Sequence, residues 1–420
     1  MSESSPSTLA HLLEHLDASV SPAHSVRHAA RRLDGAGFIE SHFGSLADGL
    51  PARGYIADQG LLLAWSQSDS TKSPFRIIGA HTDSPGLRIK ARPDVIKHGW
   101  RQLGAEVYGG ILNNSWLDRD LGIAGRVTLR DDSTVLFDSA EPVARIPQLA
   151  IHLDRDVNER GLILDKQNHL LPIWGLEMPT GRIFPSFLDW LAGRLSVSAT
   201  EIVGWDLGFY DVTSARVLGV DQSLLASGRL DNQVSCWAAV EALVAASGPH
   251  TAVIALFDHE EVGSASTHGA AGPRLEWLLS ALGNGDQRTS ADRLASSHCL
   301  SVDNAHAIHP NYPERHEPNH APRPNAGPVI KGNANQRYAS TPETQVPFVR
   351  ACSDADVPYQ VFVSNNSQPC GSTIGPITAT RLGVPTLDVG IAQLSMHSAR
   401  ELCGATDPLL LVHALSAYLS

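Results

Sequence analysis

The sequence predicts an α/β protein of two domains, and three observations support this prediction. The chain has 420 residues, which is more than one small hydrophobic core organises. Apolar runs such as Thr251–Leu256 end where acidic residues begin, as strands of open α/β sheets do. In the middle of the chain, short alternating segments with turn residues replace this pattern. We therefore expect a mostly β domain at residues 91–226, inserted into a discontinuous α/β domain formed by residues 1–90 and 227–420.

Several helices and strands can be assigned from local patterns. Leucines recur at helical spacing over residues 9–16, and a second helix should begin near Ser21 and Pro22 and end at Gly35. Residues 126–137 read as a β-hairpin, since two strand-forming segments flank Asp-Asp-Ser. A closing helix is expected from Asp407 onward, because apolar residues follow at helical spacing.

Composition excludes several classes of function. The net charge of -12 argues against a broad nucleic-acid-binding surface, which needs clustered Lys and Arg. No stretch approaches the roughly 18 apolar residues of a membrane span, and the polar start is unlike a secretory signal. Five cysteines without paired spacing suit a reducing compartment and provide no cysteine metal site. We expect a cytoplasmic protein.

Five separated positions at the ends of apolar segments carry histidine or carboxylate side chains. Each has an ordinary structural interpretation: a lone histidine is usually structural, an acidic pair is often a solvated turn, and one aspartate also suits a helix N-cap. Together they offer nitrogen and oxygen ligands of the kind that zinc and related divalent ions bind. Five residues supply six contacts to two ions if one carboxylate bridges them. The five candidate ligands are His81, Asp231, Glu261, Asp303 and His397.

Three further residues are of interest because of the residues that flank them in the sequence. Glu260 lies beside the candidate ligand Glu261, so it could move a proton to and from a metal-activated water. Asp83 follows His81 by two residues and could orient its imidazole. His152 is an ionisable group in a segment that reads as an apolar strand, where a core histidine is the simpler interpretation.

The chain resembles the aspartyl aminopeptidase family of two-metal metallopeptidases over almost its whole length. Several blocks appear in the order that the family has them, although each block alone is a weak signal. The matching blocks are Ala80-His-Thr-Asp-Ser-Pro85, Ala150-Ile-His-Leu153, Arg229-Leu-Asp-Asn232, Phe257-Asp-His-Glu-Glu-Val-Gly-Ser264, Ser301-Val-Asp-Asn-Ala-His306, Gln336-Arg-Tyr-Ala-Ser340 and Ser395-Met-His-Ser398.

The resemblance implies a role for each candidate ligand. His81 and Asp303 would bind one metal ion, Glu261 and His397 the other, and Asp231 would bridge them. The metal would be zinc in the first instance, with cobalt or manganese tolerated by the same ligands. A cis peptide bond is expected after Asp231.

The resemblance also assigns the residues that act on the substrate. Glu260 would be the general base and acid, and Asp83 would support His81. Lys331 would hold the side-chain carboxylate of an N-terminal Asp or Glu. His152 would reach the active site of a neighbouring subunit, and Tyr338 is a plausible donor nearby.

The architecture and partners follow from the same resemblance. It implies an α/β metallopeptidase domain with a central mixed sheet flanked by helices, interrupted by a β-rich dimerisation domain. Dimers would build a closed tetrahedral dodecamer that admits short peptides with an acidic N-terminal residue. Two alternatives remain open: a two-metal aminopeptidase of broader or neutral specificity, and a catalytically silent shell or binding protein.

Overall fold

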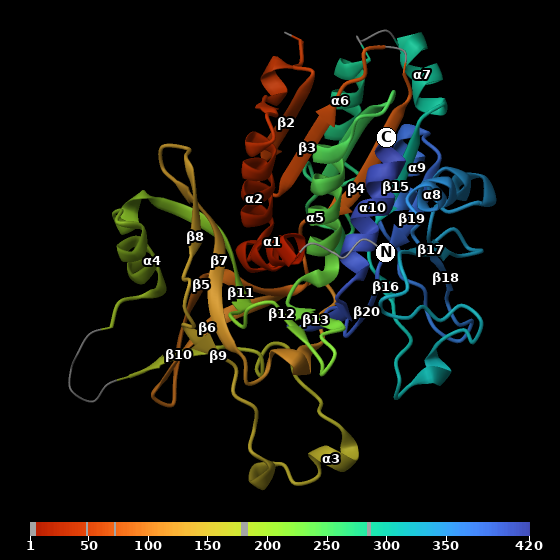
Figure 1. Ribbon diagram of the computed structural model, residues 1–420. Helices are drawn as coiled ribbons and strands as arrows, with labels where there is room; N and C mark the ends of the chain where they lie inside the picture. Colours follow the sequence, from red (N-terminus) through yellow and green to blue (C-terminus); the bar gives the residue numbers. More distant parts are fainter. Residues whose placement is uncertain (1–5, 48, 71–72, 178–183, 284–286) are drawn as a thin grey trace. The chain divides into compact units, whose positions relative to one another are not determined.

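The structure is a computed structural model, and it describes residues 6–47, 49–70, 73–177, 184–283 and 287–420 (Figure 1). The chain divides into two compact units, each built from segments that are distant in sequence. The first unit comprises Met1–Asp83, Ala215–Met396 and Glu401–Ser420, and the second comprises Ser84–Ser214 and His397–Arg400. Whether these units fold as the two predicted domains, with boundaries at residues 91 and 226, stays a prediction.

The first unit is built around a nine-stranded mixed sheet. The strands lie in the order β1-β2-β3-β14-β4-β15-β19-β17-β18, and the central strands β14, β4, β15 and β19 run parallel to one another. This arrangement confirms the predicted central mixed sheet. The strands are β1 (Ile39–Glu40), β2 (Arg53–Asp58), β3 (Leu61–Ser66), β4 (Phe75–His81), β14 (Thr251–Phe257), β15 (His298–Val302), β17 (Val329–Gly332), β18 (Gln360–Val363) and β19 (Thr386–Gly390).

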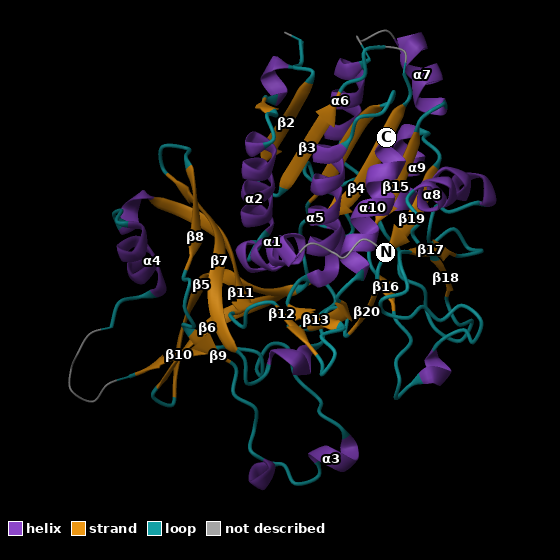
Figure 2. Ribbon diagram, viewed as in Figure 1, coloured by secondary structure: helices purple, strands orange, loops and turns teal. Residues whose placement is uncertain are grey.

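Both faces of this sheet are apolar and covered by helices (Figure 2). Strand β14 shows the cause, because all seven of its residues are buried and successive side chains point to opposite faces. Ile254 and Leu256 join a core with helices α1, α2, α5, α8 and α10, whereas Val253 and Ala255 join a second core with α6 and α9. These helices are α1 (Pro6–Ala18), α2 (Pro22–Gly35), α5 (Leu230–Ala245), α6 (Arg274–Leu282), α8 (Pro342–Asp354), α9 (Ile374–Leu382) and α10 (Asp407–Leu419).

Smaller elements complete the first unit. Helix α7 (Gln287–Ala295) precedes strand β15 in the chain. A five-stranded sheet has the order β12-β13-β21-β20-β16. Its strands are β12 (Arg216–Leu218), β13 (Leu224–Ser227), β16 (Ala305–His306), β20 (Ala392–Leu394) and β21 (Glu401–Gly404), and the short 3-10 helices of the unit are η1 (Phe43–Ser45), η5 (Glu260–Val262) and η6 (Pro313–Arg315).

The second unit is a closed antiparallel barrel. Its strands follow the order β11-β5-β6-β10-β9-β7-β8, and an additional pairing of β11 with β7 closes the ring. Leucine, isoleucine and aromatic side chains of the strands form the hydrophobic core of this unit together with residues of α4. The elements are β5 (Gly86–Lys97), β6 (Trp100–Tyr108), β7 (Asp120–Leu129), β8 (Thr134–Asp138), β9 (Ala144–Arg145), β10 (Ile173–Leu176), β11 (Ile202–Asp211), α3 (Val157–Arg160), α4 (Phe187–Leu195), η2 (Asn113–Trp116), η3 (Ile151–Leu153) and η4 (Ala199–Glu201).

Most of the local predictions are confirmed. Helices α1 and α2 cover the predicted segments, and Ser21 accepts the capping hydrogen bond from the backbone N–H of His24. Strands β7 and β8 form the predicted hairpin, and α10 begins at Asp407. One prediction is wrong: His152 lies in the exposed 3-10 helix η3, not in a strand, because no neighbouring strand pairs with this segment.

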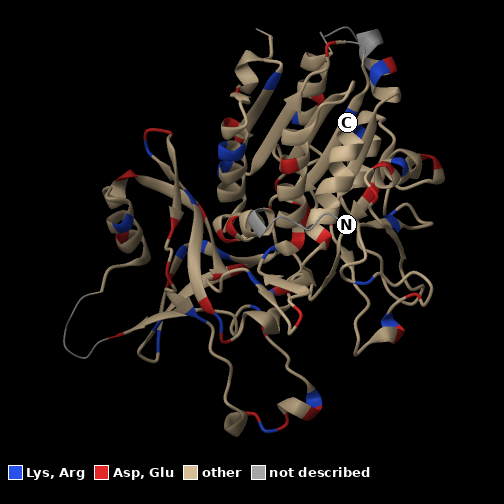
Figure 3. Ribbon diagram, in the orientation of Figure 1, with Lys and Arg blue, Asp and Glu red and all other residues tan. Residues whose placement is uncertain are grey.

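Two general properties agree with the composition. Acidic and basic residues are interspersed along both units (Figure 3). Within the described ranges, no helix has the length and apolarity needed to cross a lipid bilayer.

The buried His298 predicts a loss of stability in acid. Its Nε2 donates a hydrogen bond to the carbonyl oxygen of Thr344, and its Nδ1 is hydrogen-bonded to the Tyr418 hydroxyl. Burial lowers the pKa of His298 to about 4. The unfolded chain therefore binds this proton first as pH falls below about 6.5. Unfolding free energy should decrease between pH 6.5 and 4, by about 3 kcal/mol for this group.

Urea titrations in the presence of a chelator, at pH 7.5 and pH 5, measure this loss. His298→Asn should be less stable than wild type at pH 7.5 but should have a shallower pH dependence. Equal slopes for the two proteins would contradict the assignment to His298.

Candidate metal centre

Three parallel strands of the first unit deliver polar side chains to one edge of the sheet. His81 is the last residue of β4, Glu261 lies in η5 just after β14, and Asp303 follows β15 directly. The three strands are neighbours in the sheet, so their carboxyl ends lie together. Ligands of open α/β sheets bind at this edge.

Asp231 reaches the same edge from the first turn of α5. Asp231 and Asn232 have non-helical backbone angles, and the peptide bond between them is cis, as predicted. The side-chain amide of Asn232 donates to the carbonyl oxygen of Val302 at 2.8 Å. Asn304 donates in turn to the carbonyl oxygen of Leu230 at 3.0 Å. The two amides thus tie the Asp231 turn to the segment that carries Asp303.

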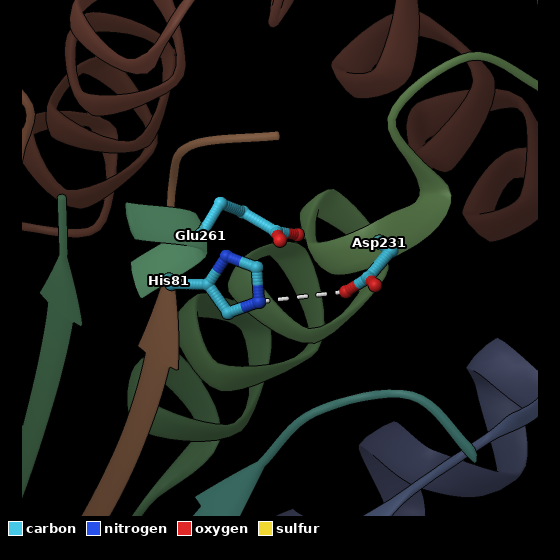
Figure 4. A group of neighbouring side chains, drawn as sticks. All are labelled: His81, Asp231 and Glu261. Carbon is cyan, nitrogen blue, oxygen red and sulfur yellow. Dashed lines mark ion pairs between the residues drawn. The ribbon is translucent and has the colours of Figure 1, made fainter. Parts of the chain in front are cut away.

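The side chains of His81, Asp231 and Glu261 converge (Figure 4). One ligand atom from each lies within 4.8 Å of the others. His81 Nε2 is 3.4 Å from Asp231 Oδ1 and 3.9 Å from Asp303 Oδ2. The mixed nitrogen and oxygen donors of this cluster fit a divalent metal ion such as zinc.

Asp83 connects the histidine to the glutamate turn. Its carbonyl oxygen accepts a hydrogen bond from His81 Nδ1 at 3.0 Å, which directs Nε2 toward Asp231. The Asp83 carboxylate accepts the backbone N–H groups of Glu260 and Glu261, each at 3.1 Å. Burial alone would lower the pKa of His81, but Asp231 and Asp83 outweigh it and raise that pKa well above 6.5.

Glu260 lies next to the cluster in a low-dielectric environment. Burial raises the pKa of Glu260 to about 8, the His81 imidazolium opposes this shift, and the carboxylates of Asp303 and Glu261 add to it. A carboxyl group in this environment can hold a proton at neutral pH, which a group that transfers protons must do at one stage of the reaction.

A buried lysine lies at the acidic end of the site. Lys331 on β17 is only 2% exposed, and its ammonium lies 3.5 Å from Asp303 Oδ1 and 3.2 Å from the carbonyl oxygen of Asn304. The Lys331 ammonium also faces the ring of Tyr338, whose centre is 5.1 Å away. Burial raises the pKa of the Tyr338 phenol above its usual value. Both predicted substrate-binding residues of the first unit therefore lie close to Asp303.

Two of the predicted site residues belong to the second unit. His397 donates from Nδ1 to the carbonyl oxygen of Gly110 at 2.9 Å. His152 is exposed within η3. The role of His397 as a metal ligand stays a prediction that rests on the resemblance. The same is true of the contact between His152 and the substrate.

A mixed α/β sheet with a histidine-carboxylate cluster at its carboxyl edge, and a second glutamate beside it, fits the class of metal-dependent hydrolases. The family model described as "Aminopeptidase I zinc metalloprotease (M18)" matches residues 15–419. The chain thus belongs to the M18 family, which confirms the resemblance seen in the sequence, and it is a metal-dependent aminopeptidase.

Individual relatives agree with this assignment. A probable M18 family aminopeptidase 2 of Streptomyces coelicolor is 50% identical over 420 residues, which cover 97% of this chain and 96% of the relative. The chain in a cryo-EM structure of the Ape4 and Nbr1 complex is 33% identical with a TM-score of 0.93, covering 98% of this chain and 85% of that chain. The S. cerevisiae mApe1 dodecamer is 26% identical with a TM-score of 0.83, covering 98% and 96%.

The structure adds a residue that the sequence did not single out. Glu401 on β21 is buried, and its carboxylate accepts the backbone N–H of Asp231 at 2.9 Å. Glu401 lies four residues after the candidate ligand His397. This short distance in the sequence is the feature that could have pointed to Glu401. Asn232 and Asn304 could have been identified in the same way, because each directly follows a candidate ligand.

Glu401→Ala should weaken metal binding by roughly 10- to 100-fold, because the residue that orients the Asp231 backbone is lost. Chelator competition measures this affinity directly. Glu401→Gln keeps an oxygen that can accept the same N–H, so it should retain most of the affinity. Wild-type affinity in the alanine variant would show that Glu401 does not position Asp231.

Proposed function

We propose that the chain releases N-terminal residues from short peptides, with preference for Asp and Glu, at a centre that binds two divalent metal ions. One observation carries the proposed specificity. Lys331 is a buried cation beside Asp303. A substrate carboxylate that enters this site would find its electrostatic partner in the Lys331 ammonium.

In the proposed centre, His81 and Asp303 would hold one ion, Glu261 would hold the other, and Asp231 would contribute to both. The close approach of His81 to Asp231, Glu261 and Asp303 supports a shared metal centre, whereas the division between two ions rests on the resemblance. The assignment of His397 to the second ion rests on the resemblance alone. Zinc is the metal that the family description names, and the same ligands also accept cobalt or manganese.

Bound divalent ions would supply the chemistry of an acidified water and a polarised peptide carbonyl. The protein residues then perform the proton transfers. Glu260 takes the proton of the attacking water and delivers it to the nitrogen of the departing peptide. Asp83 keeps Glu260 in place through the backbone N–H and orients the His81 ring. The Tyr338 hydroxyl is a further donor near Lys331.

The assembly is part of the proposal. A solved relative, the S. cerevisiae mApe1 dodecamer, supports a homo-oligomer built from copies of this chain. A closed dodecamer would admit short peptides and exclude folded proteins. An aminopeptidase of broader or neutral specificity is the alternative, since metal ligands alone do not select the substrate side chain.

Hydrolysis of Asp-, Glu-, Leu- and Lys-p-nitroanilide by the purified protein tests this function. We expect kcat/KM for the Asp and Glu substrates to exceed that for Leu and Lys by at least about tenfold. A chelator should abolish turnover, and added zinc, cobalt or manganese should restore it to different extents. Faster release of Leu would keep the chemistry and contradict the specificity. No turnover of any of these substrates with metal bound would contradict the proposed function.

A further inference from the structure

A pocket of about 230 Å³ lies in the first unit, away from the metal cluster. Arg76, the second residue of β4, lines it, whereas His81 at the other end of the same strand belongs to the cluster. The two positions are five residue steps apart along an extended strand, a distance of roughly 17 Å. The pocket is lined by Arg76, His250, Val346, Pro347, Arg350, Ala351, Asp354, Ala417, Tyr418 and Ser420.

Three basic side chains from separate elements reach this pocket. Arg76 comes from β4, Arg350 from α8, and His250 directly precedes β14. Burial lowers the pKa of His250, and the nearby charge of Arg76 lowers it further. Arg76 and His250 are therefore close enough to repel each other when both are charged.

Two acidic groups also line the pocket, the Asp354 side chain and the carboxylate of Ser420. Among the described residues, no ion pair of 4.0 Å or less joins either of them to Arg76 or Arg350. The Arg76 guanidinium instead lies over the ring of Tyr418, 5.6 Å from its centre. The Nδ1 atom of His250 is buried and has no hydrogen-bond partner among the described residues.

We infer that this pocket binds a small oxyanion, a phosphate group or a carboxylate, between Arg76 and Arg350, with His250 as a further donor. A guanidinium fork matches the oxygen geometry of both groups and forms charge-assisted hydrogen bonds with them. A bound anion would also offset the repulsion between Arg76 and His250. The site is separate from the metal centre and does not depend on the proposed substrate.

Isothermal titration of inorganic phosphate into the zinc-loaded protein tests the inference, with succinate as the carboxylate probe in a parallel titration. Arg76→Gln and Arg350→Gln should each weaken binding at least about fivefold, since each removes one guanidinium. Arg27→Gln is the matched control, because Arg27 is exposed on α2 and does not line the pocket. Any phosphate that binds at the metal centre contributes equally in all these variants.

The two probes separate the sources of the anion. Weaker phosphate binding alone in the variants assigns a phosphate site, weaker succinate binding alone assigns a carboxylate site, and weakening of both assigns a general oxyanion site. If neither probe binds more weakly to Arg350→Gln than to Arg27→Gln, the inference is wrong. Arg350 is exposed on α8, so its substitution should leave the fold intact even if Arg76→Gln does not fold.

Discussion

Replacing Glu260 with glutamine should lower kcat for peptide hydrolysis by about 10³-fold while leaving the metal affinity close to that of wild type. Glutamine has the same shape but cannot accept the proton of the attacking water. The backbone N–H of residue 260 would still donate to Asp83, so the turn keeps its anchor. The ligand atoms that lie within 4.8 Å of one another come from His81, Asp231 and Glu261, and glutamine at position 260 leaves all three in place.

Two further substitutions serve as comparisons for Glu260→Gln. Glu261→Gln removes a charge from a candidate ligand, so it should weaken metal binding as well as turnover. Glu40→Gln alters an exposed glutamate on β1 and should change neither. Stopped assays with zinc-loaded protein and chelator competition on the same preparations distinguish the three variants. A Glu260→Gln enzyme that retained more than about a tenth of wild-type kcat would assign the proton transfer to another group.

The strands that carry the site were predictable because each consists of a short run of apolar residues, which indicates burial on both faces of a sheet. The runs before His81 and Glu261 are apolar throughout, and β14 is indeed buried at all seven positions between two helical layers. The abrupt change to acidic residues marks the sheet edge where the strand leaves the core. The order of the strands was not predictable, since pairings such as β14 with both β3 and β4 join segments about 190 and 176 residues apart.

The supporting residues escaped prediction for a different physical reason. Glu401 accepts the N–H of Asp231 from 170 residues away, and only the folded chain brings them together. Asp388 on β19 accepts hydrogen bonds from the backbone N–H of Ala339 and the hydroxyl of Thr373, and so fixes the segment next to Tyr338. A single buried carboxylate in a strand has no periodic signature. His152 shows the converse error, since its apolar neighbours suggested a strand that no partner strand pairs with.

Lys331→Met should lower the ratio of kcat/KM for Asp- over Leu-p-nitroanilide by about 100-fold, the second large effect expected for this site. Losing the charged partner of a desolvated carboxylate costs about 2–5 kcal/mol, and each 1.4 kcal/mol is a factor of ten. Methionine fills a similar volume, so the buried position beside Tyr338 remains occupied. Turnover of the Leu substrate should therefore fall much less than turnover of the Asp substrate.

The Lys331 ammonium also lies 3.5 Å from Asp303, so a loss of metal must be separated from a loss of selectivity. Metal content measured on the same Lys331→Met preparation makes this separation, because an altered metal centre would slow both substrates together. Lys97→Met is the matched control: Lys97 is exposed on β5, and its replacement should leave the ratio unchanged. An unchanged ratio in Lys331→Met, with full metal content, would move the acidic preference to another residue and favour the aminopeptidase of broader specificity.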